Sequence, residues 1–124
     1  MQKRPADKFI SVHQHRIRYW DEGQGTSTVL LIHGISCSVL EWEHNIAALA
    51  QQHRVIAIDL LGCGLSDKPV DADYDMQAQA RFVFDVMDAM GLASVHMVGN
   101  SMGGRIAMEC AAMKPERVKS LVLS

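Results

Sequence analysis

Four short apolar runs, separated by longer connecting segments, constrain the fold of this chain more than any other feature. The runs are VLLIH at 29–33, VIAID at 55–59, VHMVG at 95–99 and VKSLVL at 118–123. Nearly continuous runs of valine, leucine and isoleucine are typical of strands that are buried on both faces. Because parallel strands need crossover connections, the alternation predicts an α/β domain, a three-layer sandwich with a mostly parallel sheet.

The remaining segments complete this single domain, residues 1–124. Residues 9–20 alternate between polar and apolar and predict two short antiparallel strands before the first run. Apolar residues at helical spacing predict helices over 42–50 and 76–90, and Gly91 is expected as the C-terminal cap of the second. A third helix is expected after 95–99, with a face of small residues that can pack closely on the sheet.

Composition excludes several classes of function. The chain has 48% hydrophobic and 21% charged residues, as globular proteins do, and its net charge of −2 predicts no nucleic-acid partner. No apolar run approaches the ~20 residues of a membrane span, and the charged start lacks the apolar core of a signal peptide. The three cysteines form no CxxC pair, which predicts free thiols, no metal site and a cytoplasmic location.

The segment GNSMG at 99–103 matches the pattern G-x-S-x-G of a nucleophile turn. This turn requires a strand before it and a helix after it, and both are predicted here. Gly99 and Gly103 supply the space that a backbone needs when it doubles back sharply. Ser101 would then lie at a helix N-terminus, where free N–H groups favour negative charge. The alternative is a glycine-rich strand–helix turn that contains an incidental serine.

A second segment, His33 and Gly34, follows the first apolar run. Acyl transfer needs two N–H donors for the oxyanion, one from the residue after the nucleophile and one from a neighbouring turn. Met102 and Ile35 are therefore the candidate backbone donors. His33 is expected to hydrogen-bond the turn rather than to act as general base, because a residue fixed at a strand end is badly placed to reach Ser101.

A third segment, DLLGCGLSD at 59–67, follows the second apolar run. It contains G-x-G, but it lacks a third glycine at dinucleotide spacing and no helix begins directly after it, which argues against a nucleotide site. Asp59 is expected to brace the loops by accepting hydrogen bonds from backbone N–H groups.

In this order, the three motifs resemble the N-terminal half of an α/β-hydrolase over about residues 9–124. The residues of these motifs are most similar to those of a branch that includes esterases, carbon–carbon bond hydrolases, haloperoxidase-like enzymes, epoxide hydrolases and dehalogenases. The last two use an aspartate nucleophile in that family, so Ser101 argues against both. The resemblance implies that Ser101 is the nucleophile, that Ile35 and Met102 form the oxyanion hole, and that no cofactor is used.

The resemblance also implies an acid and a histidine, which follow the nucleophile in that family. After Ser101 the sequence has no histidine, and neither Glu109 nor Glu116 matches the position of the acid. We therefore expect a truncated hydrolase core of about six strands, without a cap, whose strand 118–123 lies at an exposed edge. An uncovered apolar edge favours association, so a homo-oligomer is expected through this edge or by element swapping.

Three functions follow from these patterns. The favoured one is a serine hydrolase, a carboxylesterase that acts on small-molecule esters with short acyl groups through an acyl-enzyme at Ser101. Its base would be water or a histidine not identified by resemblance, taken from the same chain or a neighbouring subunit. The alternatives are an incomplete half-domain that needs a partner chain and, from the wording GNSMGG at 99–104, a carbon–carbon bond hydrolase.

Overall fold

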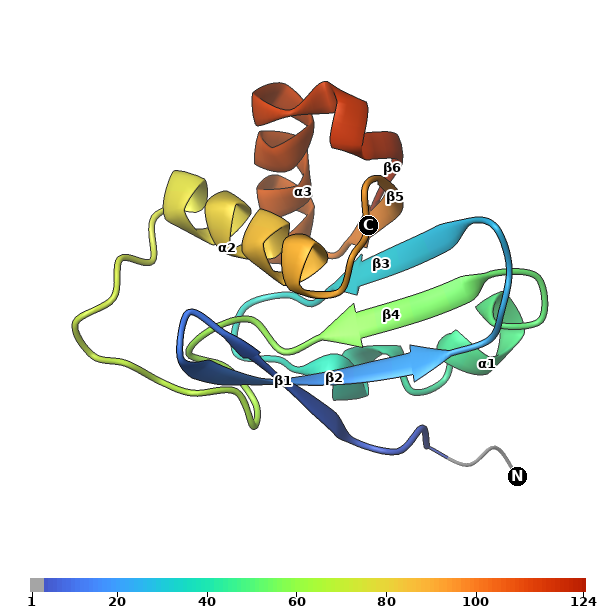
Figure 1. Ribbon diagram of the computed structural model, residues 1–124, viewed down its shortest axis with the longest axis horizontal. Coiled ribbons are helices and arrows are strands. Elements are labelled where there is room, and N and C mark those ends of the chain that lie inside the picture. The colour runs from blue at the N-terminus through green and yellow to red at the C-terminus, as the bar shows by residue number, and fades with distance from the viewer. Residues whose placement is uncertain (1–3) are drawn as a thin grey trace.

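The computed structural model describes residues 4–124, which form one six-stranded sheet with helices on both faces (Figure 1). The strands are β1 (Lys8–Val12), β2 (His15–Glu22), β3 (Thr28–Ile32), β4 (Arg54–Ile58), β5 (Val95–Gly99) and β6 (Val118–Leu123). The helices are α1 (Ile46–Leu49), α2 (Met76–Ala89) and α3 (Met102–Met113), and two 3₁₀ turns are η1 (Val39–Trp42) and η2 (Pro115–Arg117). No described helix is long and apolar enough to cross a membrane.

The sheet has the strand order β1-β2-β4-β3-β5-β6. The strands β1, β2 and β4 pair antiparallel, whereas β4, β3, β5 and β6 pair parallel. The predicted α/β sandwich with antiparallel N-terminal strands is therefore confirmed. The strand β6 lies at one edge of the sheet and β1 at the other.

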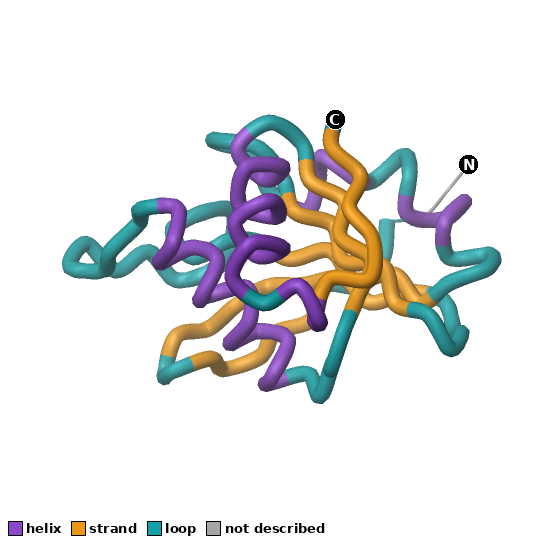
Figure 2. The backbone as a smooth tube through the Cα atoms, turned by 90° about the horizontal axis from the view of Figure 1, so that it is seen from above, coloured by secondary structure: helices purple, strands orange, loops and turns teal. Residues whose placement is uncertain are grey.

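Alternate residues of the central strands enter two separate cores. Leu30, Ile32, Ile56 and Ile58 point toward α2 and α3 and belong to the larger core. Their neighbours along β3 and β4 point to the other face, namely Val29, Leu31, Val55 and Ala57. There they pack with Val39 and Trp42 of η1 and with Ile46 of α1. Figure 2 shows the strands between the two long helices on one side and the short helical turns on the other.

The helices differ from prediction in one place. The expected helix over 42–50 is split into η1 and the single turn α1, since Glu43 and Asn45 donate backbone hydrogen bonds to residues only three positions back. The helix α2 forms as predicted, and Gly91, with φ +72°, follows its cap residue Met90. The Leu92 N–H then bonds the Met87 carbonyl at 2.8 Å, a Schellman cap.

The carboxyl ends of β3, β4 and β5 lie at the same edge of the sheet, because these strands are parallel and in register. The turns that follow them are 33–38, 59–75 and 100–101. The second of these is the long loop that projects from the left of Figure 1, coloured green to yellow. Ligands of open α/β sheets bind outside the carboxyl ends of the strands, so the three predicted motifs meet where a site is expected.

Candidate active site

Ser101 occupies a strained turn between β5 and α3. Its backbone has φ 55° and ψ −118°, a conformation that residues other than glycine rarely adopt, and Ser101 is exposed. A serine held in this way costs of order 1–3 kcal/mol, and such strain is typical of functional positions. The arrangement strand, serine at positive φ and helix is that of a nucleophile elbow.

The two glycines of the motif lie where no side chain fits. A Cβ at Gly99 would lie 2.4 Å from the carbonyl oxygen of Gly103. A Cβ at Gly103 would lie 2.1 Å from the carbonyl oxygen of Ile32, at the end of β3. The helix α3 therefore approaches the sheet so closely that its first turn touches the backbone of β3, which brings Ser101 to the neighbouring turn.

Backbone hydrogen bonds leave a free donor at the elbow. The N–H of Ser101 donates to the carbonyl of Ser124 at 3.1 Å, and the N–H of Gly103 to the carbonyl of Asn100 at 2.9 Å. Within the described residues, no acceptor is found for the N–H of Met102, the first residue of α3. Such unpaired N–H groups at a helix start are suited to bind a negative charge.

The turn after β3 lies against this elbow. A Cβ at Gly34 would lie 3.4 Å from the Cβ of Ser101 and 3.3 Å from the Asn100 carbonyl oxygen. The side chain of Ile35 is 68% exposed, and its N–H has no acceptor among residues 4–124. The structure thus brings the three predicted residues, Ser101, Met102 and Ile35, to one place.

His33 fixes the direction of this second free N–H. Its ring Nε2 accepts the N–H of Leu60 at 3.0 Å, so the proton resides on Nδ1, which donates to the Gly34 carbonyl at 2.7 Å. Since the peptide bond is planar and trans, the Ile35 N–H points opposite to that carbonyl. His33 is fully buried, and burial lowers its pKa. The expectation that His33 hydrogen-bonds the turn is confirmed.

Asp59 joins three segments below the turns. Its Oδ1 accepts the N–H of Val39 at 2.8 Å, and its Oδ2 accepts the N–H of Leu65 at 2.7 Å. The predicted brace is confirmed, but a second partner was missed. The Nε of Arg18, on β2, donates to Oδ2 at 2.7 Å, and both side chains are buried. The sequence carries no signal for this pair, since its members lie 41 residues apart.

A groove of about 540 Å³ opens beside the candidate oxyanion donors, Ile35 and Met102, which both line it, whereas Ser101 is not among its lining residues. The long loop supplies apolar side chains to the lining, including Leu61, Val70 and Tyr74. Lys68 is the one charged residue in this lining within the described chain, and its Nζ donates to the carbonyl of Ser66 at 3.1 Å. The lining suits a largely apolar group attached to a carbonyl.

The other histidines have partners away from the groove. His53 pairs with Ser27 at 2.7 Å and His96 with Ser120 at 2.6 Å, and neither lines the groove. His13, His15 and His44 are absent from its lining as well. Over residues 4–124, no group of three or more His, Cys, Asp or Glu side chains is placed to hold a metal ion.

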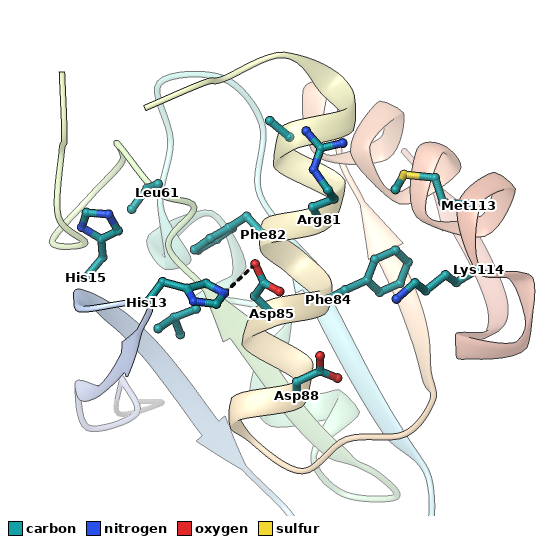
Figure 3. Close-up of a pocket in the computed structure, with 12 residues that line it drawn as sticks. His13, His15, Leu61, Arg81, Phe82, Phe84, Asp85, Asp88, Met113 and Lys114 are labelled. Carbon is teal, nitrogen blue, oxygen red and sulfur yellow. Dashed lines mark ion pairs between the residues drawn. The ribbon is translucent and has the colours of Figure 1, made fainter. Parts of the chain in front are cut away.

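A second hollow, of about 440 Å³, flanks α2 and contains none of the elbow residues (Figure 3). Several of its charged groups have partners. The His13 Nε2 lies 3.1 Å from the Asp85 carboxylate, as Figure 3 shows, and Asp88 lies 2.8 Å from Arg117. The ammonium of Lys114 lies 5.1 Å from the centre of the Phe84 ring. These contacts join residues of different elements at the surface, and Arg81 is the charged lining residue for which no such contact is found in the described chain.

Comparison with known proteins agrees with this geometry. The sequence profile of the α/β hydrolase fold matches residues 27–124. A 2-hydroxymuconate semialdehyde hydrolase of Pseudomonas sp. strain CF600 is 39% identical over 111 residues, which are 87% of this chain and 39% of that protein. The chain belongs to the α/β hydrolase family.

Solved structures give the same result. The crystal structure of a membrane phospholipase A, described as a bacterial virulence factor, has a TM-score of 0.92 and 39% identity, over 95% of this chain and 38% of that one. A meta-cleavage product hydrolase from Pseudomonas fluorescens IP01, a serine-to-alanine mutant complexed with acetates, has a TM-score of 0.85 and 34% identity, over 90% and 42%. This chain spans about a third of the length of the curated relatives that match it at 40–41% identity.

Proposed function

We propose that this chain carries the nucleophile and oxyanion hole of a serine hydrolase whose substrate is a carboxylic ester with a short acyl group. The observation that carries the proposal is the backbone of Ser101, held at φ 55° between β5 and α3. Membership of the hydrolase family supports it, as does the groove beside Ile35 and Met102.

In the proposed reaction, the Oγ of Ser101 attacks the ester carbonyl carbon. The carbonyl oxygen gains negative charge, which the N–H groups of Met102 and Ile35 bind. The alcohol leaves with the serine proton, and water then attacks the acyl-enzyme to release the acid. The proton transfers are assigned to water or to a histidine outside the groove lining. Residual catalysis of about 10³–10⁴-fold over water persists in serine hydrolases that lack triad members.

A fluorophosphonate probe and p-nitrophenyl acetate test the proposal. Wild-type protein is expected to label on one serine and to hydrolyse the ester with a burst, and Ser101→Ala is expected to abolish both. Ser11→Ala, an exposed serine of β1 at the far edge of the sheet, is the matched control and should keep wild-type rates. Hydrolysis and labelling that persist in Ser101→Ala would rule out the assignment.

A second candidate is a half-domain that completes its site with another chain. The edge strand β6 exposes 55% of Val122 and 49% of Leu123, which favours pairing with a further strand.

We propose a homo-oligomer through this edge or by element swapping, and sedimentation velocity tests it. The wild type should sediment as a dimer or larger and Val122→Lys as a monomer, whereas a monodisperse wild-type monomer would contradict it. Activity that arises only on mixing with the C-terminal half of a relative would favour the half-domain.

Carbon–carbon bond hydrolysis is favoured by the similarity to the 2-hydroxymuconate semialdehyde hydrolase and the meta-cleavage product hydrolase. The same serine and oxyanion donors would act on a ketone carbon instead of an ester. The two functions are distinguished by adding a conjugated dienol ketone to the protein and following its absorbance with time. If the absorbance decreases faster than the ester is hydrolysed, the substrate class is this ketone and not the ester.

A further inference from the structure

Glu41 was not singled out by the sequence motifs. It lies directly against the turn after β3 that contains Gly34 and Ile35, called the oxyanion turn below. The N–H of Gly34 donates to its Oε1 at 3.2 Å. A Cβ at Gly34 would lie 3.5 Å from this oxygen and 3.4 Å from the Cβ of Ser101, so the carboxylate and the nucleophile both border Gly34.

The carboxylate reaches the turn from a rigid support. Glu41 belongs to η1, whose first residue, Val39, donates its N–H to the buried Asp59. The side chains of Val39 and Trp42 are buried, and the Oγ of Ser38 caps the turn by accepting the N–H of Leu40 at 3.2 Å. Because η1 is anchored to the core, the carboxylate of Glu41 has little freedom to leave Gly34.

The second carboxylate oxygen indicates that Glu41 contributes less to stability than a fully bonded carboxylate would. Oε2 of Glu41 is buried and no hydrogen bond to it is found among the described residues, although interaction with the Glu41 carboxylate raises the pKa of the exposed Cys37 thiol. A buried acceptor without a partner costs about 1–3 kcal/mol, and more when it is charged. A buried polar group in this state calls for another explanation, and its contact with the turn supplies one.

Two groups together fix the peptide units around Gly34. Glu41 accepts the Gly34 N–H, and His33 donates to the Gly34 carbonyl. We propose that Glu41 is a positioning residue of the oxyanion hole: it holds the N–H of Gly34 so that the next N–H, that of Ile35, stays directed at the oxyanion. This inference rests on the proposed hydrolase function and assigns Glu41 no contact with the substrate.

Three variants test the proposal. Glu41→Ala removes the acceptor, and Glu41→Gln keeps an acceptor oxygen without the charge. Glu43→Ala, two residues on, is the matched control, since Glu43 pairs with the exposed Arg4 and does not contact the turn. The readouts are kcat and KM for p-nitrophenyl acetate, the rate of fluorophosphonate labelling, thermal unfolding, and hydrogen exchange of the Gly34 amide.

A positioning role predicts opposite changes in activity and stability. Glu41→Ala should lower kcat and the labelling rate by about tenfold or more at unchanged KM, less than the ~10²–10³-fold loss when a donor is removed. Its Tm should equal or exceed that of wild type, because an unpartnered buried oxygen is removed. Glu41→Gln should restore kcat to at least the wild-type value, because it keeps the acceptor and removes a negative charge near the oxyanion.

Hydrogen exchange separates this inference from the proposed function. In Glu41→Ala the Gly34 amide should exchange at least about tenfold faster, while Ile56 in β4 keeps its wild-type rate. Wild-type labelling and exchange in Glu41→Ala would overturn the positioning role, as would a loss of kcat that Glu41→Gln fails to restore. If wild-type protein neither labels nor hydrolyses the ester, the hydrolase proposal fails, and the exchange result still decides whether Glu41 holds the turn.

Discussion

The Asp59 brace and the Ser101 elbow follow two parallel strands, β4 and β5, that lie on either side of β3, yet their polar groups differ. Asp59 is fully buried, and each of its carboxylate oxygens accepts a hydrogen bond from a backbone N–H or from Arg18. Ser101 is exposed, its backbone is strained, and the N–H of Met102 beside it has no acceptor among the described residues. The carboxylate that follows β4 thus has hydrogen bonds to both of its oxygens, whereas the turn that follows β5 has a free backbone donor.

This contrast shows how a fold can support a strained turn. Strain and unpaired donors persist only where the surrounding structure holds them in place. The Asp59 brace supplies that support, because it fixes η1, and η1 presents Glu41 to the oxyanion turn. Substitutions in the brace should therefore affect stability, whereas substitutions at the elbow should affect reactivity.

The largest effect is expected for Asp59→Ala. This change removes the buried partner of the Arg18 guanidinium, which keeps only the contact of its Nη1 with Asp7 at 3.3 Å, and it frees two backbone N–H groups. Breaking one side of a buried ion pair costs about 3–5 kcal/mol. Urea denaturation followed by circular dichroism measures the loss, and Asp71→Ala, at an exposed position of the long loop, serves as control. A loss below about 1 kcal/mol would show that the brace does not carry the fold.

Gly103→Ala should follow. The added methyl group would lie 2.1 Å from the Ile32 carbonyl oxygen, so α3 must move away from β3. Because both groups are backbone, we expect a destabilisation of about 3 kcal/mol, at the upper end for overpacking. Gly91→Ala is a useful comparison, since its Cβ would meet no atom within 4 Å and only the positive φ opposes it. Equal losses for the two variants would contradict the close contact.

A pH effect of intermediate size is expected from His33. Burial lowers its pKa, so below the unfolded pKa of about 6.5 the unfolded chain binds a proton that the folded chain does not. Stability should therefore fall as pH decreases from about 6.5, by at most about 1.4 kcal/mol per pH unit from this group. His33→Asn should flatten the difference in unfolding free energy between pH 7 and pH 5. An unchanged slope would mean that His33 protonates while folded.

The smallest effect, of opposite sign, is expected at the elbow. Ser101→Gly relieves the positive φ and should stabilise the fold by up to about 1 kcal/mol, while it abolishes labelling. Ser101→Ala removes the same hydroxyl but keeps the strain, so its Tm should stay near that of wild type. If Ser101→Gly lowers the Tm, the elbow is not strained, and the contrast with the brace is lost.

Much of the fold could be predicted because burial determines the local pattern. The segments 95–99 and 118–123 form β5 and β6 with the predicted bounds. For β5 the cause is burial, since covered strands need apolar residues at most positions, whereas β6 keeps the apolar pattern although most of its residues are exposed at the edge. The helix predicted over 42–50 was right only over Ile46–Leu49, which form α1. Its apolar spacing reflects contacts of Trp42, Ile46 and Leu49 with one core, and two short turns make these contacts as well as one helix would.

The candidate site could be predicted in part. Residues that need a special backbone, such as the glycines around Ser101, are visible in a short motif because the cause is local. Arg18 and Glu41 could not be found, because their roles depend on partners 41 and 7 residues away and no local pattern marks them. The roles of Ser101, Ile35 and Met102 in catalysis remain predictions until the labelling experiment is done.

The pairing of Ser124 with the elbow has a consequence for biosynthesis. The carbonyl of Ser124 accepts the N–H of Ser101, and its own N–H donates to the carbonyl of Gly99. Residues before the turn can form β3, β4 and α2 while the chain is still being made, because proteins emerge N-terminus first. Because the Ser124 carbonyl holds the N–H of Ser101, we expect the elbow geometry to be completed only after residue 124 has emerged from the ribosome. A nascent chain should therefore fold its core first and become reactive toward the probe only after that point.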